Sequence, residues 1–177
     1  MAAKVSLKLV VGELDALTDE TSAYLNRVTG ELYALGDEEA GLIEDGVDAS
    51  ELPGWLADEL PKIREVLDSE DWLALPTRFD IHEWAIMDGF ARSLADSELR
   101  DELLTAVRGR GAFRWFKDVV HRHGIQQDWY DHRAAALGRI AADWLEDHGV
   151  EYAADAETLP GGPASNPGIQ RTAEALE

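Results

Sequence analysis

The sequence contains no cysteine among its 177 residues. This absence excludes a disulfide framework, a thiol nucleophile and a cysteine-based zinc site. It also fits a reducing compartment, so we expect a cytoplasmic protein. No apolar run approaches the ~18 residues that a membrane-spanning helix needs. The N-terminal stretch has no small-residue cleavage site typical of a signal peptide, and we expect no membrane partner.

Basic residues are scarce as well, with 16 Lys and Arg against 36 Asp and Glu and a formal net charge of −20. Such a charge repels nucleic acid and anionic membranes over most of the surface. An acidic proteome produces this composition without any binding role, and attraction of a basic partner is the alternative. Against this background, residues 108–124, "RGRGAFRWFKDVVHRHG", hold five cations and a single acid, Asp118.

Motifs for cofactors and metals are missing. The sequence has no "GxxxxGK[ST]" phosphate loop, no "HExxH" zinc motif and no "GxSxG" serine context. Asp128 and His132 share a helical face and have no evident third ligand, so they do not predict a metal site. The acidic loop near residue 46 lacks the twelve-residue calcium pattern. We therefore expect no cofactor and no metal.

Hydrophobic spacing in the N-terminal half predicts a small antiparallel sheet. Alternating apolar residues on the two sides of Gly30 predict a hairpin with strands at 22–26 and 31–35. Residues 71–75 predict a third strand, which a hairpin needs for stability. A helix is predicted before the hairpin, over residues 6–17, where Leu and Val recur at spacings of three and four.

Pro61 is the main complication in the first half of the chain. It interrupts the apolar pattern of "WLADELPKIREVLDS". Because proline lacks a backbone donor and clashes with the preceding turn, we expect the helix to begin at Pro61.

The second half of the chain is predicted to be helical. The expected helices cover residues 81–95, 97–108, 112–123 and 126–148. A capping box formed by Asp80 and Glu83 is expected to begin the first of them. Spacing predicts that Trp84 and Phe113 point inward with the apolar stripes, together with Tyr130 or its neighbour Trp129.

These elements predict an α+β fold, in which a small antiparallel sheet of an N-terminal hairpin and a short third strand packs with a mainly helical C-terminal half. Residues 1–150 are expected to form a single domain. Residues 151–177 hold several prolines and glycines and no sustained apolar face, which predicts a flexible tail.

The order of five segments is specific. They are "SLKLVVGELDAL", "YLNRVTGELY", "LPTRFDIHEWAIMDGFARSL", "RGRGAFRWFKDVVHRHG" and "WYDHRAAALGRIAADWLEDHG". Together they resemble the bacterial uncharacterised protein family numbered 0158, over roughly residues 5–150. The most specific part is "RGRGAFRWFKD" followed by "WYDHR". The resemblance implies one small α+β unit and brings no catalytic residue, because the family has no assigned activity.

The basic segment is the strongest candidate site. The predicted anion-binding residues are Arg108, Gly109, Arg110, Gly111, Arg114, Lys117 and Arg122. Two glycines permit a sharp turn, and the N-terminus of the following helix exposes N–H groups that favour anions. Arginines on both sides add donors that fit phosphate or carboxylate. We therefore expect a non-enzymatic binding or regulatory module that contacts an anionic ligand or protein partner.

Alternative interpretations stay open at this point. The arginines of the segment have enough acids elsewhere in the chain to pair with, and Arg133 is expected to clamp an acid inside the fold. An enzyme acting on a phosphorylated or nucleic-acid substrate would use His121 or His132 as acid–base group. An acidic mimic of nucleic acid is a third interpretation. A helix–glycine turn–helix also resembles DNA-binding motifs, although these carry wider basic surfaces.

Overall fold

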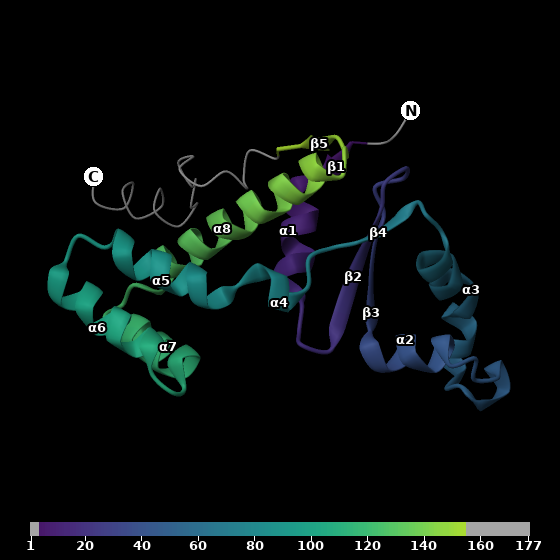
Figure 1. The fold of residues 1–177 in the computed structure, drawn as a ribbon, viewed down its shortest axis with the longest axis horizontal. Coiled ribbons are helices and arrows are strands. Elements are labelled where there is room, and N and C mark those ends of the chain that lie inside the picture. The colour runs from purple at the N-terminus through teal and green to yellow at the C-terminus, as the bar shows by residue number, and fades with distance from the viewer. Residues whose placement is uncertain (1–3, 155–177) are drawn as a thin grey trace, which may run out of the picture.

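The computed structural model describes residues 4–154 and has the predicted α+β fold (Figure 1). A three-stranded antiparallel sheet lies in the N-terminal part, and the C-terminal half is mainly helical. The elements are β1 (Val5–Ser6), α1 (Leu7–Ala16), β2 (Thr21–Asn26), β3 (Leu32–Gly36), α2 (Asp37–Glu44), the 3-10 turn η1 (Ala49–Glu51), α3 (Gly54–Asp68), β4 (Trp72–Ala74), α4 (Arg78–Ile81), α5 (Glu83–Ser93), α6 (Ser97–Arg108), α7 (Ala112–Arg122), α8 (Gln126–Asp147) and β5 (Tyr152–Ala153).

The sheet has the strand order β3-β2-β4, so the predicted hairpin and third strand are confirmed. Successive side chains of β2 point to opposite faces of the sheet. Ala23 and Leu25 join the main core, whereas Tyr24 packs against the second cluster beneath α3. The sheet is therefore covered on both faces, which explains why its short strands are stable.

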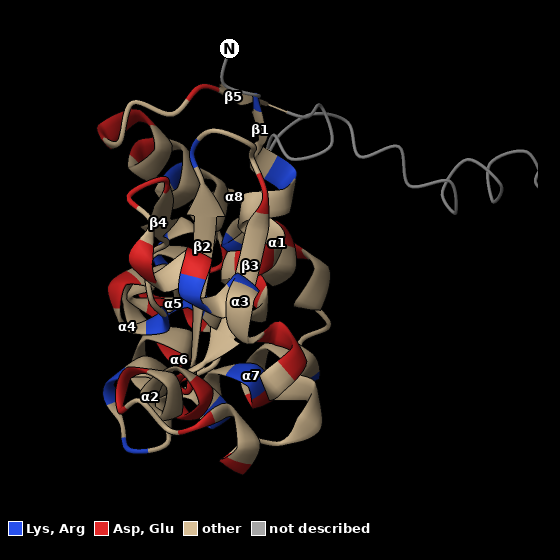
Figure 2. Ribbon diagram, turned by 90° about the vertical axis from the view of Figure 1, so that its right-hand side faces the viewer, with Lys and Arg blue, Asp and Glu red and all other residues tan. Residues whose placement is uncertain are grey.

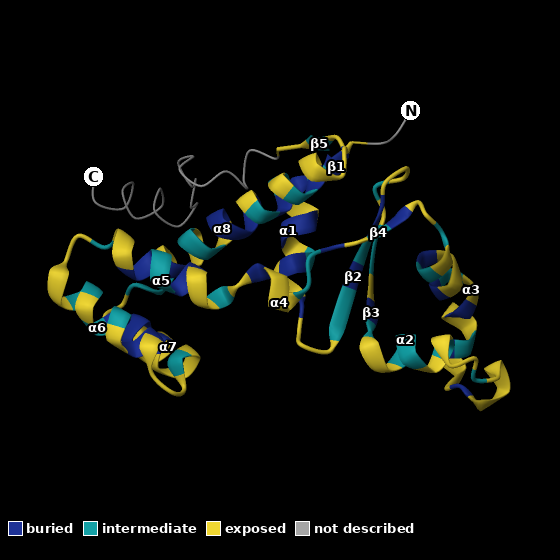
Figure 3. Cartoon of the chain, viewed as in Figure 1, coloured by how far each residue is buried: buried dark blue, intermediate teal, exposed yellow. Residues whose placement is uncertain are grey.

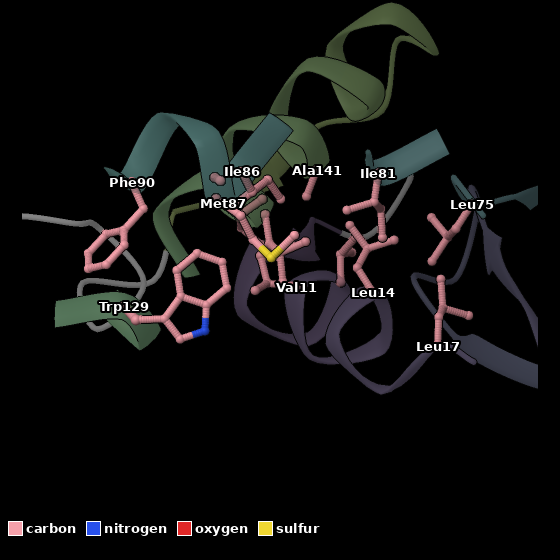
Figure 4. Packing of buried hydrophobic residues seen from close by; sticks show 14 of the residues in the cluster. Val11, Leu14, Leu17, Leu75, Ile81, Ile86, Met87, Phe90, Trp129 and Ala141 are labelled. Atoms are coloured by element: carbon pink, nitrogen blue, oxygen red, sulfur yellow. The ribbon is translucent and has the colours of Figure 1, made fainter. Parts of the chain in front are cut away.

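The main core lies where α1, α5 and α8 meet (Figure 4). Val11 of α1, Met87 of α5 and Ala141 of α8 are all buried there. The predicted first helix is confirmed, with the Ser6 hydroxyl accepting a hydrogen bond from the backbone N–H of Leu9 at 3.3 Å. This core positions the helices that carry the basic segment.

A second, smaller core joins the sheet to α3. It consists of Leu35, Leu52, Leu56, Leu60 and Ile63. The prediction that the helix begins at Pro61 is wrong, because α3 runs through it from Gly54 to Asp68. An interior proline costs about 3 kcal/mol. Burial of an apolar face that extends over both halves of the helix offsets this cost.

The chain between β4 and α5 also differs from its prediction. The capping box forms between Thr77 and Asp80, and it begins the short α4. Two hydrogen bonds from Thr77, from its backbone N–H and its hydroxyl, hold the pKa of the Asp80 carboxyl below its usual range. His82, with φ 56° in the left-handed region, then separates α4 from α5, so the box predicted from Asp80 to Glu83 is wrong.

Two large side chains predicted to point inward, Trp84 and Phe113, are exposed, and so is Tyr130. The Trp84 indole N–H donates to the carbonyl of Val107 at 2.8 Å, which holds its ring at the end of α6. Trp129 is buried in place of its neighbour Tyr130. Its ring centroid lies 4.7 Å from that of Phe116 on α7.

The two ends of the described chain lie together. β1 and β5 pair in parallel, with Val5 opposite Tyr152. Pairing thus continues beyond the predicted domain end at residue 150, and the predicted tail lies outside the described residues from 155 onward. Within residues 4–154, no helix combines the length and apolar character needed to cross a membrane.

Candidate anion-binding surface on the α6–α7 hairpin

Helices α6 and α7 pack against each other as a hairpin (Figure 1). This hairpin lies at the opposite end of the molecule from the three-stranded sheet. Asp96 begins α6 by accepting hydrogen bonds from the N–H groups of Glu98 and Leu99 at 3.0 and 3.1 Å. Each helix buries one apolar face. The buried residues are Leu103, Ala106 and Val107 of α6 and Phe116, Val119 and Val120 of α7. The remaining faces are turned toward solvent (Figure 3).

The turn between the helices uses only one of its two glycines for conformational freedom. Gly111 has φ 70°, in the left-handed region that L-residues adopt at a cost. Gly109 has φ −93° and ψ 171°, an extended backbone that other residues adopt. Gly111 leads directly into α7, and no side chain caps this helix. The first N–H groups of α7 therefore add partial positive charge beside the arginines.

Four cations of the segment form what we call the basic crest: Arg108, Arg110, Arg114 and Lys117. All four are exposed. In residues 4–154, none of their side chains forms an ion pair or hydrogen bond. Figure 2 colours lysine and arginine positions blue among red acidic positions spread over most elements. Among the described residues the crest cations thus have no carboxylate partner, although acids outnumber Lys and Arg in the chain.

Arg122 belongs to the same sequence segment but has a different environment. Its guanidinium donates to Glu102 of α6, with a distance of 2.6 Å between Nη2 and Oε1. His123 Nε2 lies 2.9 Å from the other oxygen of Glu102. Arg122 therefore ties α7 to α6, and the structure separates it from the four unpaired cations.

Arg133 shows what internal pairing looks like in this fold. It lies on α8 and contacts Glu83 of α5 and Asp15 of α1. Its side chain is 20% exposed and that of Glu83 is 12% exposed. Burial opposes the charge, but the hydrogen bonds and attraction of Glu83 and then Asp15 raise the pKa of Arg133. The predicted clamp on an acid is confirmed.

A groove of about 500 Å³ lies between α6 and α7. Its lining residues are Asp101, Glu102, Thr105, Ala106, Trp115, Val119 and Arg122. Trp115 is 57% exposed, and its ring covers Gly109, 3.9 Å from where a Cβ on that glycine would stand. Sequence reasoning missed this groove. The only signal for it was the position of Trp115 at the edge of the apolar stripe.

The two histidines of the enzyme alternative, His121 and His132, do not line the groove. His121 Nδ1 lies 2.7 Å from Nε2 of Gln126, and the groove contains no histidine. His132 stacks on Trp129 inside the helical cluster, where burial and then the charge of Arg139 lower its pKa. In the described part of the chain, no three His, Asp or Glu side chains are placed to hold a metal ion.

Comparison with known proteins adds the family. UPF0158 protein PA5073 of Pseudomonas aeruginosa is 31% identical over 70 residues, which cover 39% of this chain and 46% of that protein. The match therefore spans about half the length of that curated relative. No solved structure matches the chain. The model of the uncharacterised protein family UPF0158 matches residues 5–164, most of the sequence, and the chain therefore belongs to the UPF0158 family.

Proposed function

We propose that the chain is a non-enzymatic binding or regulatory module and that its basic crest contacts an anionic partner. The observation that supports this most is the crest itself. Arg108, Arg110, Arg114 and Lys117 are exposed and have no carboxylate partner within residues 4–154. A cytoplasmic location belongs to the same proposal, because it fits a chain without cysteine.

The large negative charge of the chain does not prevent this contact. Charges separated by more than about 8 Å are largely screened at physiological ionic strength. An anion at the crest therefore responds to the cations and helix N-terminus beside it more than to distant acids. Local attraction of this kind guides association and weakens as salt is added.

The enzyme alternative has less support. A catalytic site needs an acid–base group within hydrogen-bond reach of its substrate, usually in a concave pocket. The groove beside Trp115 is lined by Arg122 and two carboxylates, and His123 contacts one of them, Glu102, without lining the groove. The crest cations do not line that groove and are exposed at the end of α6, in the turn and on α7, which suits a contact with a partner.

The proposal is tested by capturing partners from a bacterial lysate with the immobilised full chain. Three proteins are compared, wild type and two triple variants. The first is wild type, and the second carries Arg110→Glu, Arg114→Glu and Lys117→Glu. The third carries Lys4→Glu, Arg27→Glu and Arg64→Glu. These three control positions are also exposed and form no ion pair among the described residues.

Both triple variants change the formal charge by the same amount, so only the place of the change differs. We expect the crest variant to lose the captured partner and the control variant to retain it. Circular dichroism checks that each variant is folded. Equal capture by all three folded proteins would contradict the proposal, and equal loss in both variants would show dependence on net charge alone.

A further inference from the structure

The groove between α6 and α7 has an apolar floor beside the basic crest. Ala106 and Val119 are 3% and 4% exposed and form this floor, and Trp115 stands beside them more than half exposed. The volume, about 500 Å³, falls in the range of pockets that hold small ligands or large side chains. An exposed tryptophan beside such a groove is typical of an interface anchor.

The groove has two different ends. The Trp115 ring lies 3.9 Å from where a Cβ on Gly109 would stand, so this end of the groove is next to the turn that carries Arg108 and Arg110. Glu102 lines the other end and is paired with Arg122 and His123.

Asp101 lines the groove with Glu102 and has no ion-pair partner in the described chain. A ligand in this groove therefore meets positive charge at the turn end and a carboxylate at the other. Its negative groups belong at the turn.

These features favour a protein segment over a nucleic acid. From Arg114 to Lys117 the helix rises only about 4.5 Å, which offers few phosphate contacts along α7. Nucleic-acid binding usually depends on a much wider basic surface. A peptide needs only a few charge contacts if it also buries an apolar side chain, and tryptophan and arginine are the residues enriched in such interfaces.

We infer that the partner is an acidic protein segment with an apolar anchor residue, which inserts beside Trp115 while its carboxylates contact the basic crest. This inference rests on the proposed function and names the class of its partner. The apolar anchor provides affinity through burial against Ala106 and Val119. The cations of the crest fix the direction in which the segment lies along the groove.

The test uses a displayed library of random peptides that is selected on the full chain. The enriched peptides are synthesised, and their affinities are measured for wild type and for Trp115→Ala, Thr105→Trp, Asp101→Lys and the crest triple variant. Trp115→Ala removes the wall of the groove, and Thr105→Trp fills it from an exposed position. One variant removes a groove side chain and the other adds one, so the same loss of binding in both points to the groove. Circular dichroism checks that each variant is folded.

We expect the enriched peptides to combine Asp or Glu with an aliphatic or aromatic residue. Both groove variants should weaken binding about tenfold or more, and the crest variant should abolish it. Asp101→Lys should strengthen binding, because it removes the carboxylate that repels acidic peptides. Replacing the apolar residue of the peptide by serine should have the same effect as Trp115→Ala.

Two outcomes overturn the inference and leave the proposed function standing. One is enrichment of acidic peptides that lack an apolar residue and bind both groove variants as tightly as wild type. The other is failure to enrich acidic peptides, with a single-stranded oligonucleotide binding in a crest-dependent way. If neither peptides nor an oligonucleotide bind the crest, the inference and the proposed function fail together.

Discussion

Arg133 and Arg114 lie in the same helical half of the molecule and have opposite environments. Arg133 is partly buried between Glu83 and Asp15, whereas Arg114 is exposed and unpaired within residues 4–154. The total number of acids does not explain the difference, because the chain has 36 Asp and Glu against 16 Lys and Arg, enough to pair with both arginines. The packing does: α8 lies against both α1 and α5, which bring their carboxylates to Arg133.

This comparison separates a structural arginine from one that remains available to a partner. The crest positions of α7 face away from the helices that pack against it, since Phe116, Val119 and Val120 form its buried side. No carboxylate of another element is brought to that outer face at ion-pair distance in the described chain. Loss of Arg133 should therefore affect stability, and loss of a crest cation should affect binding.

The largest predicted effect is on stability when Arg133 is replaced by methionine. The change leaves the carboxylate of Glu83, which is 12% exposed, without its partner. Removing one member of a buried pair costs 3–5 kcal/mol, and partial exposure reduces this, so we expect a loss of about 2–3 kcal/mol. Urea unfolding followed by tryptophan fluorescence measures it. Arg114→Met is the matched control. An equal loss of stability in both variants would contradict the distinction between a structural Arg133 and an available Arg114.

Alanine substitutions of the two turn glycines should have different effects on the free energy of unfolding. Gly111→Ala forces a Cβ into the left-handed region and should cost about 1–2 kcal/mol. Gly109→Ala should cost almost nothing, because its backbone is extended and its Cβ would meet Trp115 at ordinary contact distance. Thermal unfolding of both variants measures the difference. If Gly109→Ala proved the more harmful, the turn geometry described above would be incorrect.

His132 should make the stability of the folded protein depend on pH. Burial and the charge of Arg139 lower its pKa, although a hydrogen bond with the backbone of Ile86 acts in the opposite direction. As pH falls, His132 is therefore protonated in the unfolded chain before it is protonated in the folded chain. The neutral, partly buried His132 contributes to the free energy of unfolding above the ordinary imidazole pKa. This contribution is lost as pH falls through the lowered pKa of the folded chain. His132→Gln should reduce the loss of stability between about pH 7.5 and about pH 5. An unchanged loss would contradict this cause.

The smallest predicted effect on stability is that of the crest triple variant, Arg110→Glu, Arg114→Glu and Lys117→Glu. Within residues 4–154 none of these side chains forms an ion pair, so we expect the free energy of unfolding to stay within about 0.5 kcal/mol of the control triple variant. Urea unfolding of the two variants side by side measures this. A crest variant that is less stable by several kcal/mol would show that the cations are structural.

Much of the fold follows from the sequence because the apolar spacing is regular. The spacing in residues 6–17, the alternation around Gly30 and the glycines after α6, α7 and α8 predicted elements that the structure contains. Pro61 shows where local rules fail, since burial of both halves of α3 outweighs the cost of an interior proline. Trp129 and Tyr130 are neighbours on one helix, and spacing alone did not decide between them; the structure buries Trp129 and exposes Tyr130.

The sequence predicted which segment forms the candidate site, but it did not predict how the side chains of that segment are arranged in space. Charge inversion located residues 108–122, but no local rule separates Arg122 from the crest, because its partner Glu102 lies 20 residues away in the sequence. The groove depends on the packing of α6 against α7, which brings Thr105, Trp115 and Val119 together. Arg133 was predictable because it follows the buried Trp129 by one helical turn.

The most direct test of the central claim is to locate where an anionic polymer contacts the folded chain. Backbone and arginine side-chain NMR signals of the full protein are followed while poly-glutamate is added at low salt. We expect shifts confined to the hairpin, strongest at Arg108, Arg110 and Arg114, with Arg27, Arg64 and Arg133 unchanged. Shifts spread evenly over all exposed cations, or an absence of shifts at the crest, would contradict the account.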